Sequence, residues 1–333
     1  MTEQTEIRNF STGDKIEHYF LLLNWEIKTS KNAKNYLDVT LGDKSGSISG
    51  KMWDIKDFTD LSKTSVVKVR GTIEDFQGSP QLRIEKIRPA EPSENVSADD
   101  FLPISSRNFE EMRTEFFDRI SGMKNKHLKA LLEKVFDDNV FESYSKVPAG
   151  KGWHHAYIHG LLEHTLEIIN ICELMCRFHP EIHKDLLLTG AMLHDYGKIY
   201  ELSFDKGFDY TDEGKFLGHI SIAAMEVNQK ISEISGFPDL LRNQVLHLIL
   251  SHQGKMEFAS PVEPKTLEAI VLYQADELSA KVNAYKYAMI KEINSESGWT
   301  KFLPLANNAL YISNKLKNSL KDKEGKDPET LFG

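Results

Sequence analysis

The stretch PAEPSENVSADD, residues 89–100, divides the sequence into two parts that follow different periodicities. It is rich in Pro, Ser and acidic residues and has no apolar repeat, which is the composition of an exposed linker. Before it, apolar and polar residues alternate; after it, apolar residues recur at three- and four-residue spacing. We therefore predict a β domain at residues 1–90, a linker at 91–106, a helical domain at 107–320 and a charged tail at 321–333.

The part before the linker contains five predicted strands. Residues 19–27 alternate and place Leu21, Leu23, Trp25 and Ile27 on one face, so Trp25 is assigned to the core. Residues 37–41 alternate as well and end in the turn-rich segment 42–46, which predicts a hairpin. Further strands are predicted at residues 48–53, 66–73 and 81–87, with a short helix near 54–61. Five short strands in this order fit a small closed barrel.

The part after the linker is predicted to be all helical. Leu128, Leu131, Leu132 and Val135 show the three- and four-residue spacing of a helix with one apolar face. The predicted helices cover residues 109–120, 126–136, 161–178, 185–194, 219–234, 239–250 and 267–293.

Composition and charge narrow the class of protein. Hydrophobic residues make up 40% of the 333 residues and charged residues 27%, as in ordinary globular proteins. No apolar run is long enough to span a bilayer and the start is polar, so we expect a cytoplasmic protein that does not bind membranes. The net charge of −9 argues against a protein that grips duplex DNA through a basic surface. Cys172 and Cys176 are interpreted as thiols that line the core.

The twelve histidines are the most informative residues, because they fall in clusters. A divalent ion needs several nitrogen and oxygen donors from separate elements, and an adjacent His-Asp pair supplies two at once. The stretch LLLTGAMLHDYGK (residues 186–198) is an apolar helix that ends at such a pair and is broken by Gly197. The clustered histidines and one later carboxylate are His154, His155, His159, His164, His194, His219, His247, His252 and Asp276. His164 taken alone would more often be a core histidine.

This ordered set resembles the YhaM-type exoribonucleases, which join an OB-fold to an HD-superfamily domain and remove nucleotides from 3′ ends. The stretches that carry the resemblance are HHAYIHGLLEHT (154–165), LLLTGAMLHDYGKIYEL (186–202), GHISIA (218–223), HLILSHQGKMEFASPVEP (247–264), the Asp276 segment and an OB pattern that ends in KMWD (51–54). Together they cover nearly the whole chain. The fold implied is a small all-β OB-fold barrel followed by an all-α HD domain.

The resemblance implies a metal-dependent phosphodiesterase that degrades single-stranded RNA to nucleoside 5′-monophosphates with a metal-activated water. It assigns metal binding to His164, His194, Asp195 and Asp276, with Asp195 bridging, and a second ion to His219 and His252. One or two divalent ions are expected, and Mn, Fe, Co, Mg and Zn all suit these donors.

Other positions leave alternatives open. Similar sequences usually carry Gly-Gly at 159–160 and His-His at 252–253, whereas this one has His159 and Gln253. Gln253 leaves one candidate nitrogen fewer for the second ion, and His159 is interpreted as a helix-start substitution. Lys198 is a catalytic candidate that could reach the phosphate or protonate the leaving 3′ oxygen, or a lysine that favours a helix C-terminus. His154 and His155 are candidates for the terminal phosphate of the substrate, or ordinary surface histidines.

The barrel is expected to hold the strand through stacking aromatics and a basic groove. The candidates are Tyr36, Trp53 and Phe76 for the bases, and Lys34, Lys51, Arg70 and Arg83 for the backbone. Three rival functions are a hydrolase of nucleotides or cyclic dinucleotides, a non-catalytic single-strand binder, and a protein that uses one ion as a structural staple. The choice between RNA and DNA, and the oligomeric state, stay open at this level.

Overall fold

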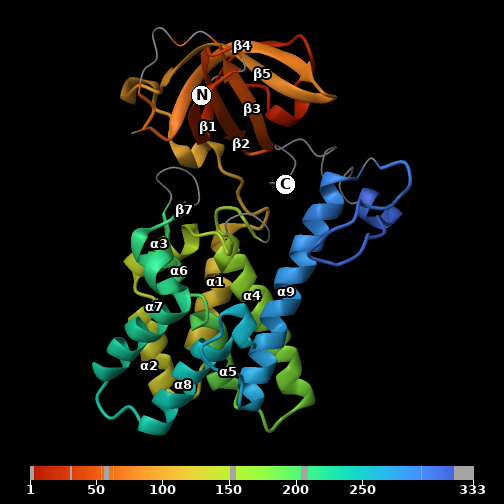
Figure 1. Cartoon of the computed structure of the whole chain (residues 1–333). Coiled ribbons are helices and arrows are strands. Elements are labelled where there is room, and N and C mark those ends of the chain that lie inside the picture. Colours follow the sequence, from red (N-terminus) through yellow and green to blue (C-terminus); the bar gives the residue numbers. More distant parts are fainter. Residues whose placement is uncertain are drawn as a thin grey trace.

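The structure is a computed structural model in which a β-barrel sits on one end of a larger helical body (Figure 1). It describes residues 4–30, 32–53, 55, 60–62, 64–150, 155–203, 209–293 and 295–318. No helix within these ranges is long and apolar enough to cross a membrane. The two-part fold predicted from the change of periodicity is confirmed.

The barrel is closed by five strands in the order β1-β2-β3-β5-β4. Their bounds are β1 Lys15–Thr29, β2 Asn35–Asp43, β3 Gly46–Met52, β4 Val66–Phe76 and β5 Ser79–Pro89. All neighbours are antiparallel except β3 and β5, whose parallel pairing of Gly50 with Leu82 closes the barrel. The predicted hairpin at 42–46 forms, and Oδ1 of Asp43 accepts hydrogen bonds from the backbone of Ser45 and Gly46. The short helix predicted near 54–61 falls mostly outside the described residues.

The predicted core face of the first strand is right only in part. A β-bulge between Leu22 and Asn24 inserts Leu23 as an extra residue and reverses the alternation. Before the bulge, the even-numbered Phe20 and Leu22 lie in the barrel core in place of the predicted odd-numbered face. Leu23 and Ile27 are both exposed. Trp25 is half-buried and packs against that core, as its assignment required.

The second body is built from nine helices within the described residues, with one very short hairpin. The helices are α1 Phe109–Ser121, α2 Lys126–Val135, α3 Asp138–Lys146, α4 Gly160–Phe178, α5 Lys184–Leu193, α6 Lys198–Glu201, α7 Asp212–Ser232, α8 Asp239–Ser251 and α9 Leu267–Lys291. The hairpin pairs β6 Leu202–Ser203 with β7 Asp209–Tyr210. All seven predicted helices are present, but α3, α6 and the hairpin were not predicted. Helix α7 starts before the predicted residue 219 and is kinked at Gly218, whose φ of 69° is not helical.

The core of this body is one continuous apolar cluster that contains Phe116, Leu132, Ile168, Leu187 and Ile249. Cys172 is buried in it and Cys176 packs against it, which agrees with their interpretation as core thiols. Helix α5 packs against α4, α8 and α9, and α9 also packs against α4 and α8. These four helices therefore supply rigid backbone around a common centre.

The two bodies meet through a small apolar joint. Residues 92–101 form two 3₁₀ turns, η2 Pro92–Glu94 and η3 Ala98–Phe101. Phe101 and Leu102 are buried with Leu21 and Val66 of the barrel and with Ile158, which precedes α4. The backbone N–H of Ile158 also donates to the carbonyl of Pro103. The end of the linker thus ties the barrel to the segment that leads into α4.

Candidate metal centre and nucleic-acid surface

The His194-Asp195 pair lies where α5 ends and the chain turns into α6. His194 caps α5, and Gly197 begins the turn before Lys198. A Cβ on Gly197 would lie 2.1 Å from the carbonyl oxygen of His219, so only glycine permits α7 to approach this turn so closely. The close approach brings His219 to Asp195.

Asp195 is the point at which the histidines converge. Its Oδ2 lies 3.2 Å from Nε2 of His194 and 3.9 Å from Nε2 of His164. Its Oδ1 lies 3.3 Å from Nε2 of His219 and 3.7 Å from Nε2 of His252. The donors thus form two groups, each of two imidazoles and one carboxylate, that share Asp195 and could each hold a metal ion.

Asp276 completes the first group from helix α9. Its Oδ1 lies 3.1 Å from Nε2 of His164, and its side chain is buried like those of the histidines around it. The structure therefore brings together all six predicted metal ligands. They come from α4, the α5–α6 turn, α7, the end of α8 and α9.

The Nδ1 atoms of the four histidines all point away from Asp195. Nδ1 of His194 lies 2.8 Å from the carbonyl of Ala191, and Nδ1 of His252 lies 2.7 Å from the carbonyl of Ile249. A carbonyl can only accept, so both Nδ1 atoms carry a proton, and Nε2 is the ring nitrogen left to bind a metal ion. Neutral imidazoles with such outer hydrogen bonds are the form that binds metals.

The other two histidines are held by side chains. Nδ1 of His219 lies 3.1 Å from Oε1 of Glu201, which also accepts the backbone N–H of His219. Nδ1 of His164 lies 3.0 Å from Oγ of Ser279, whose hydroxyl in turn donates to Glu167 over 2.7 Å. Because Glu167 takes the hydroxyl proton, Ser279 receives the Nδ1–H of His164.

Unsatisfied polar atoms test whether these residues fit an ion. Nε2 of His194, Oδ1 of Asp195 and Nε2 of His219 are buried and have no hydrogen-bond partner among the described residues. Such atoms cost free energy when buried without a partner. All three belong to the two groups that share Asp195, so cations held by these groups would satisfy them. The donor set and the unsatisfied atoms together fit divalent ions.

The pKa shifts of His164, His252 and Asp195 agree with this fit. Burial lowers the pKa of His194, but the charge of Asp195 outweighs burial and raises it. Burial lowers the pKa of His164, and burial with the charge of His194 lowers that of His252 to about 4, so both are neutral at pH 7. Burial raises the pKa of Asp195, but Lys198 and His194 outweigh it and hold the pKa well below its usual range. The carboxylate is therefore ionised, as a metal ligand must be.

A second group of candidates lies on the barrel surface. The rings of Tyr36 and Trp53 stack with centroids 4.7 Å apart, and Nζ of Lys51 lies 5.0 Å from the ring centroid of Phe76 and 5.7 Å from that of Tyr36. Trp53 and Phe76 are 53% and 50% exposed, so about half of each side chain is open to solvent. We call Tyr36, Trp53, Phe76 and Lys51 the aromatic patch.

The remaining basic candidates of the barrel are exposed, and two of them are paired. Arg70 lies 3.6 Å from Glu85 and Arg83 lies 2.6 Å from Glu74, while Lys34 is exposed in the loop before β2. Surface pairs of this kind are weak, so both arginines can exchange a carboxylate for a phosphate.

Comparisons with known proteins match both parts of the chain. Residues 161–281 match the model of the HD domain, and residues 25–90 match that of the OB-fold nucleic acid binding domain. The 3′-5′ exoribonuclease YhaM of Listeria welshimeri is 36% identical over 287 residues, which cover 84% of this chain and 90% of the relative. The proteins of the same name from Bacillus velezensis and Bacillus subtilis are 36% and 34% identical and cover 81% and 83% of this chain. The chain belongs to the YhaM family of exoribonucleases.

In this YhaM-family protein Lys198 lies inside the centre. It is the first residue of α6, is 8% exposed, and donates to Oδ2 of Asp195 over 2.6 Å and to the carbonyl of Ala149. This position does not match a lysine that merely favours a helix C-terminus. Its ammonium instead holds the shared carboxylate in place.

The histidines before α4 have different positions. His154 lies outside the described residues. His155 is 1% exposed, which excludes a surface histidine; its Nε2 lies 3.4 Å from Glu167 and its ring centroid 5.2 Å from that of His164. His155, Glu163 and Glu167 form a third group of potential ligands beside the centre.

His159 has a structural position at the start of α4. It is the N-cap residue with φ of 67°, its Nδ1 lies 2.6 Å from the carbonyl of Ser145, and its ring stacks on Phe109. It belongs to none of the three potential ligand groups found among the described residues. This agrees with its interpretation as a helix-start substitution.

Ser279, Glu201 and Glu167, which hold the metal-facing histidines from behind, were not predicted from the sequence. Two of them follow a ligand by one helical turn: Ser279 is three residues after Asp276, and Glu167 three after His164. A polar residue at that spacing on an otherwise apolar helix face is a usable signal.

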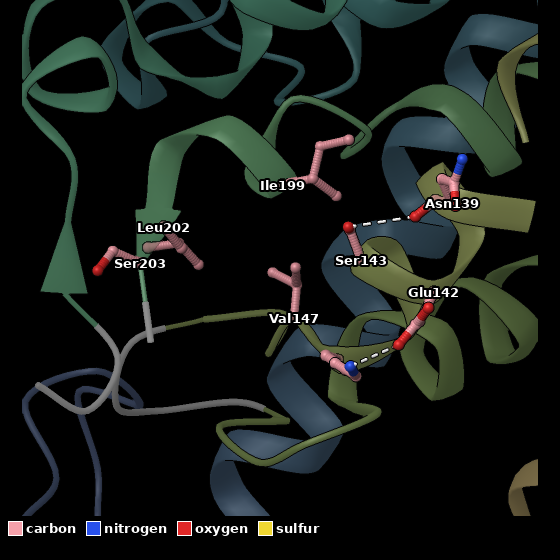
Figure 2. A pocket seen from close by; sticks show the side chains of 8 residues that line it. Asn139, Glu142, Ser143, Val147, Ile199, Leu202 and Ser203 are labelled. Atoms are coloured by element: carbon pink, nitrogen blue, oxygen red, sulfur yellow. Dashed lines mark hydrogen bonds and ion pairs between the residues drawn. The ribbon is translucent and has the colours of Figure 1, made fainter. Parts of the chain in front are cut away.

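A separate hollow of about 570 Å³ lies beside the centre, between α3 and the α6–β6 segment. Figure 2 shows the side chains of Val147, Ile199 and Leu202 pointing into it, with Ser143 and Glu142 along α3. None of the six metal-ligand candidates lines it. It is therefore a different feature from the metal centre.

Proposed function

We propose that this YhaM-family protein is a metal-dependent 3′–5′ exoribonuclease that cleaves single-stranded RNA to nucleoside 5′-monophosphates. The observation that carries the proposal is the pair of ligand groups that share Asp195 inside the HD domain. The names of the relatives support the RNA substrate and the direction of cleavage.

The two ligand groups have separate tasks in this proposal. His164, His194, Asp195 and Asp276 would hold one ion, and Asp195, His219 and His252 the second. Two divalent ions, when bound, supply an activated water and offset the charge of the scissile phosphate. Nitrogen and oxygen donors in these numbers suit Mn, Fe, Co, Mg and Zn alike, so the proposal names no single metal.

The protein's own side chains position rather than attack. Lys198 holds Oδ2 of Asp195, so that Oδ1 stays directed at His219 and His252. Its ammonium could also donate a proton to the leaving 3′ oxygen of a substrate bound at the centre. His155, buried beside His164, is the described candidate for a hydrogen bond to the phosphate.

The barrel would hold the strand. Stacking on exposed aromatic rings contributes about 1–3 kcal/mol per base and does not depend on sequence. The aromatic patch offers such rings, with Lys51 beside them, and Lys34, Arg70 and Arg83 are available for phosphates. A stacking surface accepts RNA and DNA, so DNA is a second substrate to be tested.

A hydrolase of nucleotides or cyclic dinucleotides is the second candidate, because the metal centre alone would serve it. The aromatic patch disfavours it, since a small substrate does not need a second surface on the barrel. The two ligand groups that share Asp195 offer more donors than a single structural ion needs, and a protein that only binds strands has no need of such a centre.

One assay separates these functions. The full chain, with Mn²⁺, Fe²⁺, Co²⁺, Mg²⁺ or Zn²⁺ in turn, is incubated with 5′-labelled single-stranded RNA, with the same sequence as DNA, and with free nucleotides and cyclic dinucleotides. The proposal predicts a ladder that shortens from the 3′ end and 5′-monophosphates as products. Binding of RNA without shortening, in all five metals, would refute it in favour of a binding protein.

A further inference from the structure

Gln253 lies beside the ligand group formed by Asp195, His219 and His252. Its amide Nε2 lies 3.3 Å from Nε2 of His252, the ring atom that faces Asp195. His252 is fully buried, and its ring centroid is 5.7 Å from that of His219. The end of the Gln253 side chain is therefore at the edge of the group formed by Asp195, His219 and His252.

The backbone fixes this position. Gln253 is in the turn after α8, where the N–H of Gly254 donates to the carbonyl of Ser251. Gly254 has a φ of +77°, and a Cβ there would lie 2.2 Å from the ring of Tyr273. The turn consequently packs against α9, and residue 253 is held with its side chain toward His252.

The hydrogen bonds at His252 define what the amide does there. Nδ1 of His252 donates to the carbonyl of Ile249, so Nε2 carries a lone pair that receives the Gln253 N–H. That lone pair is also the one a metal ion uses. An N–H directed at a cation is repelled, whereas a half-turn of the amide puts Oε1 in nearly the same place and attracts it.

We infer that Oε1 of Gln253 is a ligand of the ion bound by Asp195, His219 and His252. This inference rests on the proposed two-ion centre and adds a ligand to its second ion. That ion then has two nitrogen and two oxygen donors from the protein, as the first has from His164, His194, Asp195 and Asp276. The loss of a nitrogen at position 253 therefore does not leave the second ion short of a donor.

The new ligand is neutral, which distinguishes the two ions. The first ion is held by the carboxylates of Asp195 and Asp276, the second by Asp195 alone. The second ion is accordingly the weaker one and leaves first when metal is withdrawn. A carbonyl oxygen also suits Mn²⁺ and Mg²⁺ better than the softer ions.

The test compares Gln253→Leu, which removes the oxygen at similar volume, with Gln253→Glu, which keeps an oxygen there and adds charge. Gln229→Leu, at an exposed position of α7, controls for a new leucine. Metal-free full-length protein is titrated with Mn²⁺ by calorimetry, and the spin-coupled signal of paired Mn²⁺ ions is followed by electron paramagnetic resonance. Circular dichroism checks that each variant is folded.

We expect two Mn²⁺ ions in the wild type. Gln253→Leu should lower the affinity of the weaker ion at least about tenfold, with loss of the coupled signal at Mn²⁺ concentrations that saturate the wild type. Gln253→Glu should keep or strengthen that ion. If Gln253→Leu leaves the weaker ion unchanged or binds it more tightly, the amide only competes for His252 and the inference is overturned.

Failure of the proposed function has a different signature. A wild type that binds two Mn²⁺ ions but does not shorten RNA would contradict the exoribonuclease and leave the ligand assignment supported. A wild type that shortens RNA while it binds a single ion would overturn the ligand assignment and leave the exoribonuclease supported.

Discussion

The barrel and the helical body place their polar functional groups in opposite ways. The barrel has an apolar core and carries its candidates on the surface, where Trp53 and Phe76 are about half exposed. The helical body buries its candidates, and His164, His194, Asp195 and His252 are at most 2% exposed. A surface site can lose one side chain without disturbing its scaffold, whereas a buried centre depends on every partner.

Because of this difference, substitutions in the barrel and in the metal centre should change different measured quantities. Stacking on an exposed ring sets affinity, and a neighbouring ring can partly replace it. Ligands around a shared carboxylate act together, so the loss of one affects metal binding and turnover at once. The predictions below test this separation, beginning with the largest effect.

Replacing Asp195 by Ala removes the ligand common to both groups. We expect RNA hydrolysis to fall more than about a thousandfold, because even a single donor at a reacting centre contributes two to three orders of magnitude. RNA affinity, measured by fluorescence anisotropy, should stay within about twofold, because the barrel is untouched.

The alanine variant leaves the buried Lys198 without its carboxylate and could fail to fold. Asp195→Asn keeps the shape of the side chain and serves as the second variant. Asp212→Ala, at an exposed position at the start of α7, is the matched control and should be fully active. Hydrolysis above about a tenth of the wild-type rate in both Asp195 variants would show that the reaction occurs elsewhere.

Glu201→Gln weakens the support behind His219. The carboxylate accepts both the Nδ1–H and the backbone N–H of His219, and outer partners of this kind are worth about 10- to 100-fold in metal affinity. We expect Mn²⁺ affinity to fall within that range for one ion only, as measured by calorimetry. Exposed Glu213 on α7, the helix that carries His219, provides the control Glu213→Gln. Equal weakening of both ions would contradict two separable groups.

Trp53→Ala tests the aromatic patch. We expect the affinity for single-stranded RNA to fall about fivefold, at the low end of the range for one stacked base, because Tyr36 and Phe76 remain. The rate on a dinucleotide should not change. Trp299→Ala removes an equally exposed tryptophan from the helical body and should leave RNA affinity intact. An equal loss in the two variants would mean that Trp53 has no special role.

The smallest effect is expected at the edge of the barrel. Arg88 donates to both carboxylate oxygens of Glu94 over 2.9 and 2.7 Å, and this pairing holds the pKa of Glu94 below its ordinary value of 4.5. A pKa that is lower in the folded state stabilises the protein above pH 4.5, and the stabilisation is lost as the pH falls through the folded pKa.

Glu94→Gln should therefore lower the midpoint of thermal unfolding at pH 7 by less than about 3 °C, because the pair is partly exposed. The difference from the wild type should shrink in strong acid. Glu91→Gln, whose carboxylate is 3.9 Å from Arg88, is the control and should change less. If the difference in unfolding midpoint between Glu94→Gln and the wild type grows in acid, the pKa of Glu94 is not lowered by Arg88 in the folded state.

Sequence periodicity predicted the barrel and most of the helices because alternating and helical patterns depend only on local spacing. It failed at Leu23, because a bulge is set by the pairing partner and not by the strand itself. It also missed α3, whose nine residues bury only Phe141, Tyr144 and Ser145 and give too short a repeat to recognise.

The six metal-ligand candidates could be named from the order of His and Asp residues and from the family resemblance, and the structure brings them together. Their partners could not. Glu201 at the end of α6 contacts His219 on α7, and Ser279 contacts His164 although 115 positions separate them in the chain. Contacts of that kind follow from packing in three dimensions, which spacing along the chain does not encode.

Gly197 has a consequence for how many ions the centre can hold. It contributes no donor atom, yet the missing Cβ is what allows the His219 backbone to lie against the α5–α6 turn. A methyl group at this position would push α7 away from the turn and move His219 away from Asp195. In the proposed two-ion centre, the number of ions bound would thus depend partly on the absence of a Cβ at position 197.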